Sequence, residues 1–591
     1  MMGTISDKLM RIINTKEDIR QALISKGYDV PTSIPFKEYA KMILDLPCKA
    51  DSFPDIEGIV ARYSASGLTN EQMAANPVWV DKTSNGHDLQ LKNLAWGGMS
   101  GVGGYADNWN SSADWAINSY WVNSYTDHKL QFIKASSVVQ ARSNNIYNAE
   151  NVYKNILNVN GLTEAVNKGS VKALRIIATD PITSKAIKTL SFDSDGVIQI
   201  SFDDVLQDCY VAYFLSGNNT NDIDITIEQL PLYPGALVFD GVDDYGVCDN
   251  FPILTKEKGY TVVVLRQWDQ DFLNTTLTGG LLSTRNYSTG EGVAFEKIES
   301  SNKGYWNLGA GGIIDFAKSP FTWQTSKQYN NVGILKGGKN HGKPLCVGCG
   351  LSGGQQCGRF AIWELVILDH DATEEELTKI KNYFVKTYPW LFPDQAWTVV
   401  GKTNEDEDRA TIANITGNGN DLVLSNFGFI EGSGYNKEGE YAGYLVTDGV
   451  DDKVQSSSFT MNEDWTIVGD WELLSNVQIN CGIVKAQNVY LYNTANGLLI
   501  SINNPRSLQS FGTKSLHAIC SDGRLYDRNW VEYEYTVDQN FEIVESSLNI
   551  GFNLNNYIQI AFKNLGIYNN QILSKDECIK AYNYLQTIKS K

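Results

Sequence analysis

Basic side chains and long apolar runs are scarce in this sequence. Among 591 residues, 49 are Lys or Arg and 68 are Asp or Glu, so the formal net charge is −19. A chain of this sign repels the phosphate backbone of nucleic acids, and nucleic-acid binding is therefore not expected. No stretch approaches the roughly 18 to 20 apolar residues that span a bilayer, which argues against membrane insertion.

Cysteine and proline are also sparse. The nine cysteines are odd in number and scattered, which argues against a disulfide framework and predicts buried free thiols. The first twenty residues lack the unbroken apolar stretch of a signal peptide, so we expect assembly in the cytoplasm of the producing cell. Beside 14 Pro stand 51 Gly, 14 Trp and 30 Tyr, a composition that favours strands joined by tight turns.

One segment of the sequence occurs twice. GALVFDGVDDYG at 235–246 returns as GYLVTDGVDDKV at 443–454. The segments around these two copies also match, in the same order: 80–105 with 413–435, and 360–391 with 560–588. The sequence therefore predicts a duplicated module.

The landmarks of the module indicate its architecture. ThrGlyAsnGlyAsnAsp at 416–421 is a turn signal followed by the alternating LVLSNF of a half-buried strand. The closing segment has a strand, then Thr373 as N-cap with Glu376 three residues later and an apolar stripe at helical spacing. Many short strands with regular turns predict a mainly β protein of tandem antiparallel sandwiches, each closed by one helix.

Domain boundaries follow from the spacing of the repeats. Asp88 and Asp243 lie 155 residues apart, whereas the matching Asp421 and Asp451 lie 30 apart, so about 125 extra residues interrupt the first module. Strand-like runs such as KALRIIAT predict that this insertion is a small β sandwich of its own. The expected units are a helical element at 1–50, a first sandwich at 51–105 plus 232–393, the insertion at 106–231, and a second sandwich at 394–591.

The N-terminal 50 residues differ in kind from the rest. Their apolar residues recur at helical intervals and predict two helices, the second starting near Pro35. Two short helices bury too little surface to be stable alone, so we expect a partner or other copies of the chain to cover them. The residues expected to make this contact are Leu9, Ile12, Ile19, Leu23, Phe36, Tyr39 and Ile43.

These motifs resemble known families. The order of DxTGNGNDLxL, FDGVDDY and a strand with a terminal helix resembles concanavalin A-like, laminin-G-type jelly rolls. The string NTKEDIRQALISKGYDVP with IPFKEYAKMI is similar to an N-terminal element of structural proteins of tailed bacteriophages. Together they resemble a fibre or appendage protein of a crAss-like bacteriophage of Bacteroidetes.

The resemblance implies a structural, non-enzymatic role in the virion. Its N-terminal helices would contact capsid or tail proteins and other copies of the chain, most simply as a homotrimer. The jelly rolls would project outward and could touch host or mucus glycans. The alternative is a polysaccharide-binding or polysaccharide-degrading enzyme with lectin-like modules.

An aromatic stretch at 108–125 is the candidate carbohydrate site. Sugars stack on Trp and Tyr rings while neighbouring Asn and Asp bind their hydroxyl groups. The residues are Trp109, Trp115, Tyr120, Trp121 and Tyr125. The other interpretation is that alternate rings simply fill the core of a sandwich.

Paired acids in the repeated turn are the candidate metal ligands. Laminin-G-like folds are known to bind calcium at loop carboxylates, which makes Asp243, Asp244, Asp451 and Asp452 possible ligands. The other interpretation is a turn kept in water by its charge. Adjacent strand residues point to opposite faces, so neither pair can act as the two carboxyl groups of a glycosidase. We expect no other cofactor.

No catalytic residue is predicted. The GLSGG of 350–354 fits G-x-S-x-G, but it precedes a strand, whereas a nucleophile elbow joins a strand to a helix. Cys346, Cys349, Cys357 and His341 could suggest zinc, yet the second module has no equivalent ligands, and buried thiols are the favoured interpretation. No acid–base pair of a glycosidase is recognisable in the sequence.

Overall fold

The computed structural model describes residues 53–588, apart from several internal segments. The segments outside the description are 119–121, 127, 135–140, 148–152, 203–204, 206, 218–222, 255–258, 270–271, 273–274, 285–293, 299–302, 307–311, 316–331, 337–343, 352–354, 438, 440, 475–481, 487–488, 495–496, 503–508, 512–515, 535–544, 551 and 554–555. The two predicted N-terminal helices, with all seven of their apolar contact residues, lie outside the described residues.

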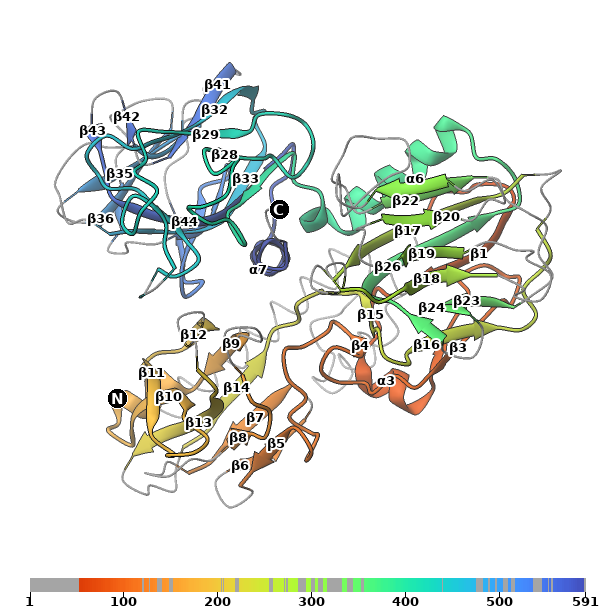
Figure 1. Ribbon diagram of the computed structural model, residues 1–591, viewed down its shortest axis with the longest axis horizontal. Coiled ribbons are helices and arrows are strands. Elements are labelled where there is room, and N and C mark those ends of the chain that lie inside the picture. Colours follow the sequence, from red (N-terminus) through yellow and green to blue (C-terminus); the bar gives the residue numbers. More distant parts are fainter. Residues whose placement is uncertain are drawn as a thin grey trace, which may run out of the picture.

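The first sandwich is built from two antiparallel sheets (Figure 1). One has the order β22-β17-β26-β15-β4 with β1 also on β26, and its strands are β22 Val332–Lys336, β17 Thr261–Trp268, β26 Arg359–Leu368, β15 Leu237–Asp240, β4 Gly101–Val102 and β1 Ile59–Ser64. The other has the order β2-β3-β16-β23-β18-β19-β20-β21. Its strands are β2 Val78–Trp79, β3 Leu89–Lys92, β16 Tyr245–Cys248, β23 Leu345–Val347, β18 Gly279–Ser283, β19 Ala294–Ile298, β20 Lys303–Trp306 and β21 Gly312–Asp315, joined by β24 Cys349–Leu351 and β25 Gln355–Cys357. The short helix α3 Asn70–Ala75 lies between β1 and β2.

The second sandwich repeats this strand order. Its first sheet runs β38-β33-β44-β31-β30 with β27 on β44, and it continues past β38 through β39 and β40. These strands are β38 Leu516–Cys520, β33 Trp465–Leu473, β44 Ile560–Asn569, β31 Leu445–Val446, β30 Gly434–Tyr435, β27 Gln395–Thr398, β39 Arg524–Asp527 and β40 Glu532–Glu534. The opposite sheet runs β28-β29-β32-β41-β34-β35-β36-β37. Its strands are β28 Thr411–Ile412, β29 Leu422–Ser425, β32 Lys453–Thr460, β41 Glu545–Ile550, β34 Gly482–Ala486, β35 Val489–Thr494, β36 Gly497–Ile502 and β37 Gln509–Phe511, with a separate β42 Phe552–Asn553 and β43 Asn556–Tyr557.

Matching sequence segments occupy matching places in the two sandwiches. Segment 80–105 carries β3 and β4, and segment 413–435 carries β29 and β30, each pair at the same ends of its two sheets. The central strands β26 and β44 are buried almost throughout, because a helix covers one face of the sheet and the opposite sheet covers the other. The predicted mainly β fold of tandem antiparallel sandwiches with an inserted β domain is confirmed.

The inserted domain has two five-stranded antiparallel sheets around its own core. The first sheet is ordered β11-β10-β13-β8-β5, with β11 Ala186–Phe192, β10 Val171–Thr179, β13 Tyr210–Gly217, β8 Ala141–Ser143 and β5 Trp115–Ile117. The second is ordered β12-β9-β14-β7-β6, with β12 Gly196–Ser201, β9 Lys154–Asn160, β14 Ile225–Gln229, β7 Lys129–Phe132 and β6 Val122–Tyr125. A short helix, α4 Leu162–Asn167, follows β9.

The two ends of the inserted domain leave the first sandwich side by side. Leu232 N donates to Gly104 O and Tyr233 N donates to Gly103 O, each at 2.8 Å. Gly103 N in turn donates to Ala236 O, also at 2.8 Å. The incoming and outgoing chains therefore form a short hydrogen-bonded ladder between the two domains.

Each sandwich ends in a capped helix. In α6 (Glu374–Thr387), Thr373 Oγ1 accepts from Glu376 N, and Glu376 accepts in return from Thr373 N, so the predicted capping box is confirmed. In α7 (Lys575–Gln586), Ser574 and Glu577 form the same box. A 3-10 turn, η1 (Pro389–Leu391), follows α6.

A buried ion pair ties α6 to its sheet. Arg62 of β1 and Glu364 of β26 lie with Nε and Oε2 3.3 Å apart, and both side chains are almost fully buried. Arg62 Nη2 also donates to Tyr383 Oη of α6 at 2.8 Å, while Tyr388 Oη donates to Glu364 Oε1 at 2.9 Å. Desolvation raises the pKa of Glu364, and the charge of Arg62 acts against that rise.

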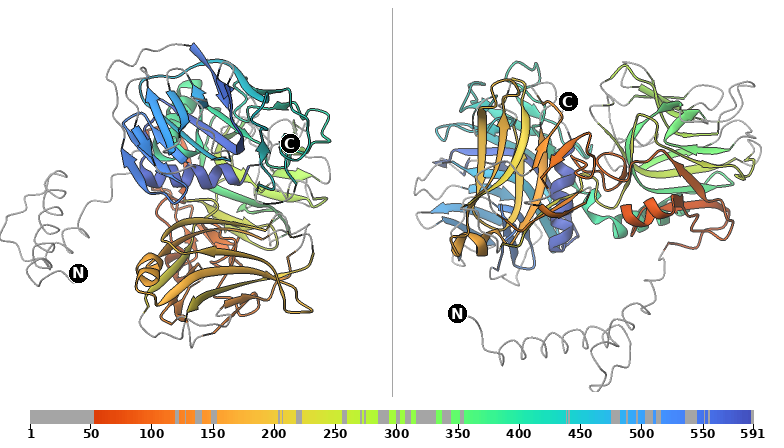
Figure 2. Two further views of the ribbon diagram at one scale, coloured as in Figure 1. Left: turned by 90° about the vertical axis from the view of Figure 1, so that its left-hand side faces the viewer. Right: turned by 90° about the horizontal axis from the view of Figure 1, so that it is seen from below.

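The three β domains meet in one shared core. α6, η1 and α7 contribute side chains to it together with strands of both sandwiches, while Ile156 and Val197 extend it into the inserted domain. Figures 1 and 2 show α7 at the centre of the molecule, between the second sandwich and the other two domains. Hydrogen bonds also join the first sandwich to the second. Tyr568 Oη donates to Trp390 O at 2.9 Å, and Gln267 Nε2 donates to Thr587 Oγ1 at 2.8 Å.

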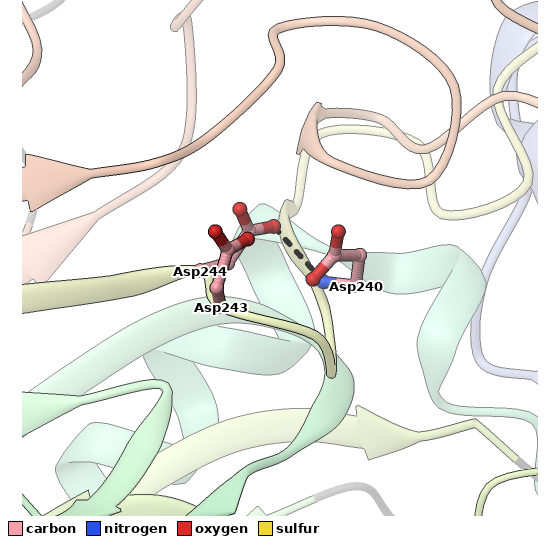
Figure 3. Close-up of side chains that lie close together, drawn as sticks. All are labelled: Asp240, Asp243 and Asp244. Atoms are coloured by element: carbon pink, nitrogen blue, oxygen red, sulfur yellow. Dashed lines mark hydrogen bonds between the residues drawn. The ribbon is translucent and has the colours of Figure 1, made fainter. Parts of the chain in front are cut away.

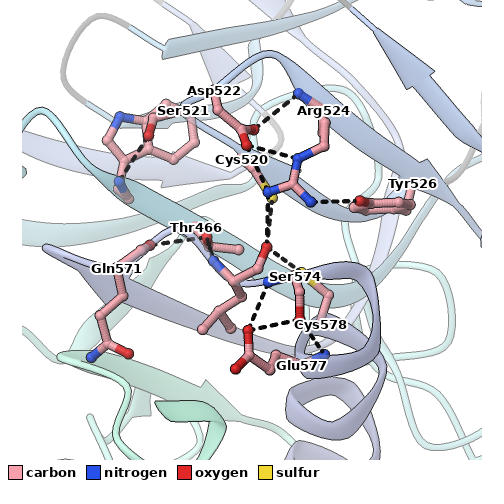
Figure 4. A network of polar contacts seen from close by, with 12 residues as sticks. Thr466, Cys520, Ser521, Asp522, Arg524, Tyr526, Gln571, Ser574, Glu577 and Cys578 are labelled. Atoms are coloured by element: carbon pink, nitrogen blue, oxygen red, sulfur yellow. Dashed lines mark hydrogen bonds and ion pairs between the residues drawn. The ribbon is translucent and has the colours of Figure 1, made fainter. Parts of the chain in front are cut away.

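The carbonyl group of Leu573 fixes the start of α7. Figure 4 shows the surrounding network, with Arg524, Cys520 and Cys578 at the start of the helix. It accepts hydrogen bonds from Arg524 Nη2 at 3.1 Å and from the thiols of Cys520 and Cys578 at 3.8 and 3.9 Å. Leu573 N donates to Thr466 Oγ1 at 2.9 Å. Three strands of the sheet thus hold the helix in place through one residue. Within the described residues, no helix is long and apolar enough to cross a membrane.

Candidate functional site

The repeated Asp-Gly-Val-Asp-Asp turn has one structure in both sandwiches. Figure 3 shows the three aspartates of the first copy. In the first copy, Asp240 N donates to Asp244 Oδ2 at 3.0 Å and Val242 N donates to Asp240 Oδ1 at 2.7 Å. Gly241 has φ +79°, and a Cβ there would lie 2.8 Å from Arg359 Cβ, so glycine is required. The turn closes on its own carboxylates.

The second copy makes the same bonds. Asp448 N donates to Asp452 Oδ2 and Val450 N donates to Asp448 Oδ1, both at 2.8 Å, while Ser433 Oγ donates to Asp452 Oδ1 at 3.1 Å. Asp243 and Asp451 are exposed, which fits a turn kept in water by its charge. Asp244 and Asp452 are buried instead, so the interpretation that charge keeps the paired acids in water is wrong for these two residues.

Burial sets the protonation of these two acids. Desolvation, followed by the charge of Asp240, raises the pKa of Asp244 from 3.8 to about 7. Desolvation likewise raises the pKa of Asp452 to about 6. Both groups therefore hold a proton more tightly than an exposed aspartate does.

The turns satisfy few of the requirements of a calcium site. Each copy brings three carboxylates together, with one oxygen from each within 4.8 Å of the others. Calcium takes six to eight oxygen ligands, and in both turns backbone N–H groups already point at the carboxylates. The hydrogen bonds account for the repeated motif without an ion, and calcium at Asp243, Asp244, Asp451 and Asp452 stays a prediction of the sequence.

The aromatic stretch does not form a common exposed surface. Trp109 and Trp115 are 1% and 2% exposed and pack edge to face in the core of the inserted domain, with ring centroids 6.2 Å apart. Tyr125 is 44% exposed, and Tyr120 and Trp121 lie outside the described residues. For the two tryptophans, core packing is therefore the correct interpretation and a sugar platform is wrong.

A polar network explains the position of the core tryptophans. Buried Asp107 accepts from Trp115 Nε1 at 3.2 Å, Tyr153 Oη at 2.6 Å and Asn155 Nδ2 at 2.9 Å. Desolvation raises the pKa of Asp107 to about 6, and the hydrogen bonds from its neighbours oppose the rise. This network organises the inserted domain rather than exposing a site.

The strongest candidate site is a groove between the inserted domain and the second sandwich. It consists of two adjoining cavities of about 670 and 340 Å³, which share Val197 and Asn529 as lining residues. We call the pair the interdomain groove. Gly196 has φ +136°, and a Cβ there would lie 2.9 Å from Asn529 O, so the two domains touch at the junction of the cavities.

Helix α7 forms one wall of the larger cavity. Lys575, Asp576, Ile579, Lys580 and Asn583 line it, and their spacing places them on one face of the helix. The opposite wall comes from the inserted domain, chiefly from β9 and the turn before β12. Because the shared core fixes α7, the groove has a preformed wall.

The smaller cavity combines aromatic and charged side chains. Asp470 accepts from Tyr444 Oη at 3.0 Å and from Gln586 Nε2 at 3.3 Å. Glu472 lies two residues further along β33 and pairs with Arg528, with the closest atoms 3.5 Å apart. Phe192 reaches the cavity from the inserted domain. Such mixtures are typical of sites that bind small polar ligands.

Buried polar atoms without protein partners lie along the groove. His517 Nδ1, Trp530 Nε1 and Asn583 Oδ1 find no hydrogen-bond partner among the described residues. Desolvation lowers the pKa of His517 to about 4, so its imidazole is neutral at pH 7. An unpaired buried polar atom costs about 1 to 3 kcal/mol, so these three atoms lower the stability of the region beneath the groove.

No sequence motif indicates this groove. Its residues come from segments that are far apart in the chain: β9, β11, β12 and 230–234 on the side of the insertion, and Tyr444, β33, β38, 528–532 and α7 on the side of the second sandwich. The only local signal is the polar face of α7, which looks like an ordinary solvated helix face. The predicted site residues and the groove residues do not overlap.

Comparisons with known proteins give limited information. No family model matches the sequence, and the comparison with curated proteins gives no match. Among solved structures, the chain is similar to the botulinum neurotoxin serotype D binding domain, with 10% identity and a TM-score of 0.23, over 57% of this chain and 88% of that chain. It is also similar to a Trypanosoma rangeli sialidase in complex with sialic acid, with 9% identity and a TM-score of 0.24, over 79% and 83% of the two chains. Likenesses at this level assign neither a ligand nor an activity.

Proposed function

We propose that this protein is a non-enzymatic structural component of a bacteriophage particle, a head or tail appendage that binds glycans. Residues 1–46 attach it to capsid or tail proteins, with a homotrimer as the simplest assembly. The three β domains project outward. Its site of action is the virion, which is assembled in the cytoplasm of the host.

The observation that carries the binding role is the interdomain groove. A shared core makes the three domains one body, and the groove between two of them presents aromatic, charged and polar groups together. Attachment rests on the resemblance of the N-terminal segment to elements of tailed phages. The net charge of −19 supports a protein that faces solvent and avoids nucleic acid.

The attachment role can be tested in assembled particles. Deletion of residues 1–46 should leave soluble, folded β domains that no longer join particles, and mass spectrometry of purified virions would measure their copy number. Leu23→Asp should have the same effect, because a buried unpaired charge costs several kcal/mol. Lys16→Asp, on a charged position of the same segment, is the control and should still assemble. Truncated protein at normal copy number would contradict the proposal.

A further inference from the structure

We infer that the interdomain groove binds a neutral oligosaccharide. This inference rests on the proposed binding function but is independent of attachment to a virion. It replaces the aromatic stretch at 108–125 as the location of the carbohydrate site. Three observations carry it: the charges, the ring side chains and the size of the cavities.

The charges of the groove favour a neutral ligand. Five carboxylates line it, namely Asp195, Asp470, Glu472, Glu532 and Asp576, against three cations, Lys575, Lys580 and Arg528. Asp470 already accepts from Tyr444 and Gln586, and Arg528 already pairs with Glu472. An anionic glycan would therefore meet an excess of negative charge, while neutral hydroxyl groups can bind to carboxylates and cations alike.

Ring side chains face the smaller cavity from both domains. Phe192 of β11 and Tyr444 of the second sandwich line it, and both are half-buried. Sugar C–H faces pack well against such rings. The cavities of about 340 and 670 Å³ fall within the range of roughly 300 to 1,000 Å³ usual for ligand sites, and together they form a track for several sugar units.

Ser191 offers a way to block the groove without disturbing the core. Its side chain is exposed and lines the smaller cavity from β11. Ser191→Trp would place a large ring in that cavity. Thr189→Trp, two residues earlier on the same strand, is the matched control, because Thr189 is also exposed but lines neither cavity.

The test uses the full-length protein and a glycan array that pairs neutral oligosaccharides with sulfated and sialylated forms of the same backbones. We expect binding to neutral glycans and weaker binding to the anionic forms. Calorimetry with the best array glycan should give a Kd that weakens at least about tenfold in Ser191→Trp and changes little in Thr189→Trp. Glu472→Gln, which keeps the shape of the side chain, should weaken binding in the same direction.

Three results would overturn the inference, and each leaves the attachment test unaffected. Binding that Ser191→Trp leaves intact would place the glycan elsewhere on the molecule. A preference for anionic glycans, or for peptides when a peptide library is offered, would refute the neutral-sugar assignment. Release of new reducing ends from the bound glycan, lost in Glu472→Gln, would show an enzyme instead of a binding protein.

Discussion

Asp244 is a buried acid held by the backbone of its own turn, and its equivalent Asp452 is held in the same way. In each turn the first aspartate binds the N–H group two residues later, the glycine supplies a left-handed backbone, and the last aspartate closes the turn from inside. The third and fourth side chains both face water, since Val242 and Val450 are 74% and 70% exposed and Asp243 and Asp451 are exposed as well. The motif is repeated because its first, second and fifth positions have structural roles in both copies.

The raised pKa of Asp244 predicts a specific pH dependence of stability. Its pKa is about 7 in the folded protein and 3.8 in an exposed aspartate, so the folded state holds the proton more tightly. The resulting stabilisation is complete below pH 3.8 and is lost as the pH rises through about 7. Asp244→Asn keeps an acceptor for Asp240 N but cannot ionise. The wild type loses this stabilisation between pH 5 and pH 8, whereas the variant does not. The difference in free energy of unfolding between variant and wild type should therefore shift by about 1 to 3 kcal/mol in favour of the variant over this range.

Urea unfolding at the two pH values measures this difference. Asp243→Asn, at the exposed neighbouring position, should follow the wild-type pH profile. Parallel profiles for wild type and Asp244→Asn would contradict the assignment. Calcium can be examined in the same samples: we expect an unchanged Tm on addition of calcium or chelator, and a rise with calcium would favour a metal site at the turns.

The ion pair between Arg62 and Glu364 makes a second prediction at the scale of single residues. Glu364→Ala leaves a guanidinium group buried without its counter-charge, which should lower the free energy of unfolding by about 3 to 5 kcal/mol. Glu405→Ala breaks a pair with Lys437 that lies on the surface, so chemical denaturation should show a change near zero. Equal effects of the two substitutions would contradict this account.

Helices α6 and α7 make equivalent predictions at the scale of elements. Thr373→Ala and Ser574→Ala each remove the N-cap side chain of a capping box, and each should cost about 1 kcal/mol. The second substitution should also raise hydrogen exchange in the first turn of α7, next to Lys575 and Asp576 of the groove. Thr378→Ala, in the interior of α6, is the control. An unchanged stability in both cap variants would show that tertiary contacts alone position the helices.

Elements that depend on local signals were predictable from the sequence. The alternating strand after 416–421 and the start of α6 at Thr373 follow from turn residues, side-chain period and capping, which act within a few residues. The duplicated order of these signals was enough to predict two similar sandwiches. Local signals fail for the aromatic stretch, because Trp109 and Trp115 have the same spacing whether they fill a core or cover a surface.

The groove could not be predicted because it belongs to no single element. Its walls come from segments that meet only after three domains have packed together, and the unpaired atom of His517 becomes visible only when its burial is known. The same holds for the ion pair of Arg62 with Glu364, whose residues are 302 positions apart.

At the scale of the whole molecule, the shared core couples the sandwiches. Leu391 of η1 is fully buried in it, so Leu391→Ala should cost about 2 to 5 kcal/mol and raise hydrogen exchange in both α6 and α7. Leu424→Ala removes a side chain from the core of the second sandwich alone and should leave α6 protected. If Leu391→Ala raised hydrogen exchange in only one of α6 and α7, the two sandwiches would be energetically independent.

The ladder between residues 103–104 and 232–233 has a consequence for how this molecule can change over generations. Because the ends of the insertion lie together, a different domain with adjacent termini could replace it at this point without a change in the fold of the first sandwich. Such an exchange would replace one wall of the groove while α7 kept the other. Recombination at a single short junction could therefore supply new ligand preferences to an unchanged scaffold.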